Sequence, residues 1–243
     1  MDDPAPDASH ALRAGLHSPA QALDFVRWLA AAWTDRPLSP ADGCPEAELA
    51  AAEARLGFPL PAALRSGYAL FGRRDDLTRT QDALLPPSGL YVDRADEAAD
   101  GMLVFREENQ SCAFWGLPLS APDRDDPPVL VDAGDGWFPF LPRMSLAWVE
   151  LVLTEFLLGS PHYDACELPP ALLPALHARH ARLPLPDHPM WASWADSPIR
   201  WYAAPGRLLR HDGPGPRSWL HATTRTPAEL AALHADFPTR WVR

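Results

Sequence analysis

Apolar residues recur at helical spacing in three segments of the first third of the chain, and they predict three helices. These helices cover residues 18–33, 45–56 and 61–72. The first begins with Ser18-Pro19-Ala20-Gln21, a capping-box pattern with proline in the first turn. Gly57 and Gly72 follow the second and third segments, where glycine commonly ends a helix.

Short apolar runs separated by turn residues predict a group of strands in the middle of the chain. They lie near residues 102–106, 111–117, 128–132 and 137–141. The connections are short and include Gly134-Asp135-Gly136, so neighbouring strands are expected to be antiparallel. A strongly apolar helix is predicted over residues 146–158, with Ser145 as its N-cap.

The last third of the chain predicts a connector and a small β-meander. Residues 161–198 are rich in proline and contain a weak helix near 170–181, which Pro174 interrupts. Three short strands and a helix are predicted within residues 199–243. The pattern leaves open whether this meander extends the first sheet or packs separately.

The predicted fold class is therefore α+β, a mostly antiparallel sheet flanked by helices, with a C-terminal β-meander plus helix extension. The expected organisation is a loose N-terminus (1–17), an α+β domain (18–160), a connector (161–198) and an extension (199–243).

Charge is distributed unevenly along the 243 residues, whose net charge is −11. Residues 1–164 contain 12 Arg and 26 Asp or Glu, whereas residues 165–243 contain 9 Arg and 6 Asp or Glu. An acidic domain repels nucleic acid and anionic membranes and attracts basic partners. Simple solubility is the alternative explanation. All 21 basic residues are Arg, and the chain has 29 prolines. This composition is typical of the codon bias of a GC-rich bacterial genome.

The cysteine content and the N-terminus predict a cytoplasmic protein. The three cysteines are widely spaced, which is typical of reduced thiols. The acidic start Met1-Asp2-Asp3-Pro4 lacks the basic and apolar regions of a signal peptide. No apolar run is long enough to span a bilayer.

The polar tip between the first two predicted strands is a candidate contact site for a partner protein. It consists of Glu107-Glu108-Asn109-Gln110, and Trp115 follows in the next strand. The alternative is an ordinary turn, in which Asn109 accepts a left-handed backbone and the carboxylates are solvated. Adjacent glutamates at a strand end point to opposite sides, so they make a poor acid–base pair.

The acidic loop Asp123-Arg124-Asp125-Asp126 is a second candidate. It lacks the glycine and the trailing glutamate of an EF-hand, so a solvated loop or a docking point for a basic partner fits better than calcium. The candidate partner-binding residues are thus Glu107, Glu108, Asn109, Gln110, Trp115, Asp123, Asp125 and Asp126.

Motifs for catalysis are weak or missing. His177, His180 and His188 lie close in sequence and suggest zinc, but no H-E-x-x-H motif occurs. No G-x-S-x-G, G-x-G-x-x-G or G-K-[ST] motif occurs, and no cysteine has an evident histidine partner. We expect no metal and no cofactor. Most of the ten tryptophans are expected in the core, with Trp191 and Trp194 as a possible exposed anchor.

Two ordered motifs resemble those of the SUKH superfamily, which includes bacterial toxin-immunity proteins and the Smi/Knr-type fungal cell-wall-assembly regulator. The first motif is Pro45 to Gly72, where Gly57, Leu60-Pro61 and the closing aromatic-Gly pair fit the family pattern. Phe71 stands where the family usually has Asn. The second motif comprises Glu108-Asn109-Gln110, Trp115-Gly116 and Asp126-Pro127-Pro128-Val129, followed by the helix from Ser145.

The resemblance covers residues 45–160 and implies an α+β fold with a non-enzymatic binding role. The leading hypothesis is an immunity-type protein that occludes the active site of a basic toxin domain, plausibly a nuclease. A regulatory or scaffold protein of the same fold is the alternative, and a metal-dependent hydrolase using the three histidines is a third. Nothing is transferred to residues 165–243.

Overall fold

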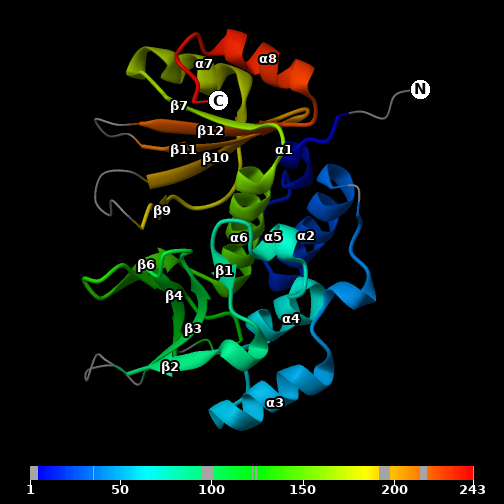
Figure 1. Ribbon diagram of the computed structural model, residues 1–243, viewed down its shortest axis with the longest axis vertical. Coiled ribbons are helices and arrows are strands. Elements are labelled where there is room, and N and C mark those ends of the chain that lie inside the picture. The colour runs from blue at the N-terminus through cyan, green and yellow to red at the C-terminus, as the bar shows by residue number, and fades with distance from the viewer. Residues whose placement is uncertain are drawn as a thin grey trace. The chain divides into compact units, whose positions relative to one another are not determined.

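The computed structural model describes residues 5–34, 36–94, 101–121, 123, 125–191, 198–213 and 218–242 (Figure 1). It is an α+β protein with two antiparallel sheets and flanking helices, as the sequence predicted. The chain divides into two compact units. The central unit comprises residues 17–27 and 36–156, and the terminal unit comprises the described parts of 1–16, 28–35 and 157–243.

The three predicted helices of the first third are present close to their predicted boundaries, as α2 (Pro19–Trp33), α3 (Glu46–Leu56) and α4 (Ala62–Phe71). Two short helices that were not predicted, α1 (Ala8–Ala11) and α5 (Asp75–Thr78), are also present, with a 3-10 turn at Pro40–Asp42. At the start of α2, the Gln21 N–H donates to the Ser18 hydroxyl, and the Gln21 side chain accepts from the His17 N–H. Gly57 ends α3 in the left-handed region with φ 84°.

Residues 1–17, predicted to be loose, contain α1. The Asp7 carboxylate caps this helix by accepting from the Ser9 N–H, and Ala8, Leu12 and Leu16 are buried.

The first sheet, defined as β1 to β6, lies in the central unit. Its strands are β1 (Ala83–Leu84), β2 (Tyr91–Asp93), β3 (Met102–Glu107), β4 (Phe114–Pro118), β5 (Val129–Asp132) and β6 (Trp137–Leu141). The order is β1-β3-β4-β5-β6, with β2 also paired to β3, and all pairs are antiparallel. The four longer strands coincide with the predicted ones.

Helix α6 (Met144–Gly159) supplies the core of the central unit around Trp148, which is fully buried. The Trp148 indole packs edge-on against Tyr68, Phe71 and Phe105, and its Nε1–H donates to the Ala63 carbonyl. A Cβ atom on Gly67 would lie 2.1 Å from this ring, so glycine is required where α4 meets α6.

The second sheet, defined as β7 to β12, belongs to the terminal unit, so the meander does not extend the first sheet. Its strands are β7 (Tyr163–Glu167), β8 (Ala181–Arg182), β9 (His188–Pro189), β10 (Pro198–Ala204), β11 (Arg207–Asp212) and β12 (Trp219–Thr224). The order is β7-β12-β11-β10-β8, with β9 also paired to β10. Three of these strands arise from the segment interpreted as a connector, which is therefore part of the second sheet.

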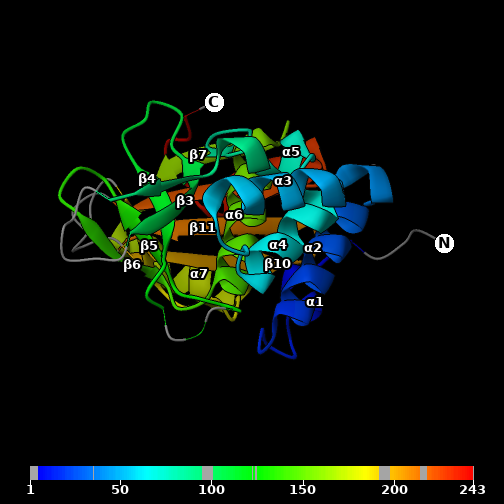
Figure 2. The ribbon, with the colours of Figure 1, turned by 90° about the horizontal axis from the view of Figure 1, so that it is seen from below.

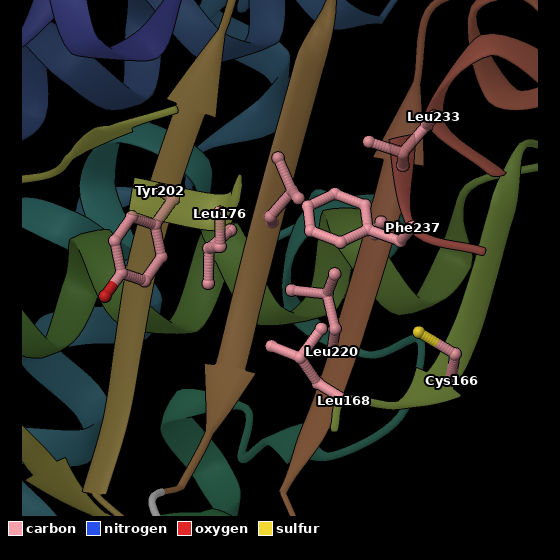
Figure 3. Packing of buried hydrophobic residues seen from close by; sticks show 9 residues of the cluster. Cys166, Leu168, Leu176, Tyr202, Leu220, Leu233 and Phe237 are labelled. Atoms are coloured by element: carbon pink, nitrogen blue, oxygen red, sulfur yellow. The ribbon is translucent and has the colours of Figure 1, made fainter. Parts of the chain in front are cut away.

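Helices α7 (Leu173–Arg179) and α8 (Pro227–Asp236) lie along one face of the second sheet (Figure 1). Between helices and sheet, Leu176, Leu209, Leu220, Leu233 and Phe237 form a continuous apolar core (Figure 3). Pro174 lies in the first turn of α7, where its missing N–H costs no helical hydrogen bond, so it begins the helix rather than interrupting it. A 3-10 turn at Pro170–Leu172 precedes it.

Candidate functional site

The tip between β3 and β4 is organised around Glu108, which is only 5% exposed. Its carboxylate accepts from the Gln110 and Cys112 N–H groups, and its backbone carbonyl accepts from the Ser111 N–H. Ser111 has a positive φ of 58°. Glu108 thus stabilises the turn through hydrogen bonds to its backbone. Because its side chain is buried, we no longer count it among the candidate contact residues. Glu107 is half-buried, whereas Asn109 and Gln110 are exposed.

Trp115 and Asp126 are also buried, so neither presents its side chain to a partner. The Trp115 ring lies between the Arg106 guanidinium, 4.4 Å from its centroid, and Phe140. The Asp126 carboxylate accepts from the Ser145 N–H (2.7 Å) and the Ser145 hydroxyl (2.6 Å). Because α6 begins at Met144, Ser145 lies inside its first turn and is not the N-cap that the sequence predicted. The Asp126 carboxylate caps this end of the helix instead.

Asp123 and Asp125 remain exposed in the loop before β5. The Asp123 carboxylate accepts from the N–H groups of Asp125 and Asp126, as in an Asx turn. The Asp125 carbonyl accepts from the Ala63 N–H (2.8 Å) at the start of α4, and Asp125 is exposed.

The register of the first sheet brings together a surface that the sequence did not reveal. The side chains of directly paired residues lie on the same face of a sheet. One row across the sheet is Glu107, Phe114, Asp132 and Trp137, and the next is Tyr91, Val104, Gly116, Leu130 and Pro139. A third row is Asp93, Met102 and Pro118. We call this side of the sheet the open face; within it, Val104, Met102 and Gly116 are buried.

The described helices of the central unit lie on the opposite side of the first sheet in two views (Figures 1 and 2). Tyr91 is 41% exposed, and Phe114 and Trp137 are half-buried. A Cβ atom on Gly116 would lie 2.8 Å from the Trp137 ring, so this glycine lets the indole lie flat across β4. The Trp137 Nε1–H donates to the Asp93 carboxylate at 3.2 Å. The open face therefore has ordered aromatic rings.

Carboxylates surround these rings, and the rows of the open face contain no arginine. Burial raises the pKa of Tyr91, and the nearby Glu107 and Asp93 carboxylates raise it further. Asp132 accepts from the Gly134 and Gly136 N–H groups, which fixes the β5–β6 turn. The open face is thus aromatic and acidic.

Two arginines of the central unit form ion pairs with glutamates outside the open face. Arg65 pairs with Glu46 and Glu53, and Arg73 pairs with Glu48. Among the described residues, no ion pair joins an arginine to Glu107. The negative charge of Glu107 is therefore not neutralised by an arginine of the described chain.

Beneath the sheet, Arg106 is buried among three carboxylates. Its guanidinium donates to Asp82 (2.9 Å), Glu150 (2.9 Å) and Glu155 (3.0 Å), all of them buried. Although burial opposes its charge, these carboxylates raise the pKa of Arg106, whereas burial raises the pKa of Glu155. This cluster links β3 to α6 inside the unit and offers no access to a reactant.

A cleft of about 550 Å³ lies at another edge of the central unit. One wall is the break between α3 and α4, with Phe58 and Leu60, and the other is the end of β4 and its following loop, with Leu119, Ala121 and Asp125. Pro118 belongs both to the cleft and to the open face. The cleft is mainly apolar.

The histidines of the zinc hypothesis occupy separate environments. His177 lies 3.3 Å from the Tyr202 hydroxyl, His180 is buried against Phe237, and His188 is buried in β9, with its Nδ1 3.1 Å from the Pro186 carbonyl. Across the described residues, no three His, Cys, Asp or Glu side chains are grouped to hold a metal ion.

The terminal unit contains a polar chain of Tyr163, His221, Asp212 and Arg210. The Tyr163 hydroxyl lies 2.8 Å from His221 Nδ1, and His221 Nε2 lies 3.4 Å from the Asp212 carboxylate. The Arg210 guanidinium donates two hydrogen bonds to the same carboxylate. Burial lowers the pKa of His221. Because these four side chains contact one another within the second sheet, we interpret the chain as structural.

The predicted tryptophan anchor is only partly described: Trp191 is half-buried, and Trp194 lies outside the described residues. The open-face residues Tyr91, Phe114 and Trp137 were missed because their shared face follows from strand register. Alternation along each strand was visible, but the bulge between Val104 and Arg106 changes which residues share a face.

Comparisons with protein-family models, curated proteins and solved structures found no match. The resemblance drawn from the two motifs therefore stays a prediction. None of the helices in the described ranges has the length and apolar character needed to cross a bilayer.

Proposed function

We propose that this chain is a non-enzymatic protein-binding module that covers a basic surface of its partner with the open face of the first sheet. The observation that supports this proposal best is the ordered aromatic and acidic composition of that face. Tyr91 and Trp137 supply aromatic area, and Glu107 supplies charge that no arginine in the described chain neutralises.

Such a surface suits recognition of a protein. Tyrosine and tryptophan are enriched at the energetic centres of interfaces because they bury large rigid areas at low entropic cost. Carboxylates around them select basic partners and accelerate encounter by electrostatic attraction. Net charge favours the same partner class, since residues 1–164 carry 26 acidic residues against 12 arginines.

The immunity role is the specific form of this proposal. It draws on the resemblance to the SUKH superfamily and requires no chemistry from this chain. Binding would block a toxin's active site by steric exclusion, and a basic nuclease domain fits the charge. The regulatory or scaffold role uses the same face with a different partner.

The test uses an inactive variant of a toxin domain encoded beside this gene, titrated with the full chain by calorimetry and by stopped-flow association. We expect tight binding whose association rate falls as salt rises, because screening weakens steering. Glu107→Lys should slow association by about tenfold, whereas Tyr91→Ala should mainly speed dissociation.

Asp75→Lys, at an exposed position in α5, is the matched control because it changes net charge equally away from the open face. Equal effects of Asp75→Lys and Glu107→Lys would contradict the proposed face. Absence of toxin binding, combined with open-face-dependent binding to another protein, would replace the immunity role by the scaffold role.

A further inference from the structure

We propose that the cleft between the α3–α4 break and the β4–β5 loop receives an apolar side chain from a partner's extended segment, followed by a basic residue. This inference extends the proposed function and rests on it for the class of partner. The volume, lining and charge of the cleft support this assignment.

The volume and lining match an anchor pocket. The cleft holds about 550 Å³, within the range of roughly 300–1,000 Å³ typical of ligand pockets. Its apolar walls include Phe58, Leu117 and Leu119, and two prolines stiffen the α3–α4 break. Burial of one large apolar side chain stabilises a complex because it removes apolar surface from water.

The walls are fixed before any partner arrives. The Ala63 N–H donates to the Asp125 carbonyl at 2.8 Å and joins the start of α4 to the β4–β5 loop. The Glu53 carboxylate accepts from the Leu60 N–H at 3.0 Å and holds the α3–α4 break. A preformed site loses less entropy on binding.

Charge decides what accompanies the apolar side chain. Arg65 lines the cleft, but Glu46 and Glu53 already neutralise it. Asp125 is exposed, and among the described residues no ion pair engages its carboxylate. Among the described rim residues, the charge without an ion-pair partner is therefore the negative charge of Asp125, which favours Arg or Lys and disfavours an acidic segment.

Continuity with the open face favours a protein segment over a small molecule. Pro118 pairs with Met102 in the third row of the open face and also lines the cleft. A chain lying across the acidic face reaches the cleft without leaving the surface. The same partner class then serves both sites.

The experiment selects peptides from a random phage-displayed library on the immobilised full chain and measures each synthetic peptide by fluorescence polarisation. We expect enriched peptides to share a large apolar residue followed within two positions by Arg or Lys. Ala62→Trp should weaken their binding by about tenfold or more, because an indole at this exposed lining position fills the mouth of the cleft.

Asp125→Asn should weaken binding by about threefold to tenfold, as expected for one partly screened charge. Two exposed positions outside the cleft, Ala51→Trp in α3 and Asp75→Asn in α5, are the matched controls and should leave affinity unchanged. Acidic consensus peptides, peptides insensitive to Ala62→Trp, or no enrichment would each overturn the inference.

Failure here is separable from failure of the proposed function. Peptides weakened by Glu107→Lys but not by Ala62→Trp would keep the open face and reject the cleft. Peptides weakened by Ala62→Trp but not by Glu107→Lys would support the cleft and contradict the open face as the shared binding surface.

Discussion

The guanidinium of Arg106 lies beside Asp82, Glu150 and Glu155, so one buried cation faces three buried carboxylates. The sequence showed an arginine in a strand but not its partners, which are 24 to 49 residues away. Such a cluster depends on distant residues that only the fold brings together. Sequence periodicity carries no information about it.

Arg106→Met is expected to destabilise the protein by about 3–5 kcal/mol, because it leaves three buried carboxylates without their common partner. The free energy of unfolding from urea denaturation measures this loss. Arg27→Met, which removes an exposed ion pair with Asp24, is the control and should cost at most about 1 kcal/mol. Equal losses would show that the Arg106 cluster contributes no more than a surface pair.

Glu108 and Asp126 are buried, although the sequence placed both among the candidate contact residues. Both lie in polar stretches that predict solvent exposure, yet each carboxylate folds inward to accept backbone N–H groups. Asp and Glu perform this role as readily as they bind a partner. Asp125, one residue before Asp126, stays exposed, so single positions decide the outcome.

At the scale of elements, apolar periodicity predicted α2, α3, α4, α6 and the four longer strands of the first sheet. Strand β7 was missed because Tyr163–Glu167 is short and lies beside proline-rich sequence. It becomes a strand by pairing with β12 over five positions, from Trp219↔Glu167 to Thr223↔Tyr163. That partner lies more than 50 residues later, so local propensity could not indicate it.

The start of α6 gives a test at this scale. Asp126→Ala removes the acceptor for the Ser145 N–H and hydroxyl, and it should lower the free energy of unfolding by about 1–2 kcal/mol. Asp135→Ala at the exposed β5–β6 tip is the control and should change stability by less than about 0.5 kcal/mol. A negligible effect of Asp126→Ala would mean that water replaces the cap without cost.

At the scale of the whole molecule, acidic charge is concentrated in residues 1–164, whereas buried histidines belong to the terminal unit. Burial lowers the pKa of both His180 and His211 from 6.5 to about 4. A histidine kept neutral by the fold contributes stability above its unfolded pKa. That contribution is lost as pH falls from 6.5 through about 4.

His180→Phe therefore should reduce the acid sensitivity of the protein. The aromatic ring preserves stacking on Phe237, but it binds no proton on unfolding. Relative to this variant, the wild-type chain should lose roughly 3 kcal/mol of unfolding free energy between pH 6.5 and pH 4. Urea titrations of both proteins at several pH values measure the difference, and a difference independent of pH would contradict the prediction.

The three thiols differ sharply in accessibility. Cys44 and Cys166 are buried, and burial raises the pKa of Cys166 to about 12, whereas Cys112 is exposed at the β3–β4 tip. A maleimide fluorophore should therefore react at a single position near neutral pH without any engineered cysteine. The dye would lie at the β3–β4 tip, two residues before Phe114 of the open face. A macromolecule that binds this face would therefore change the emission of the dye.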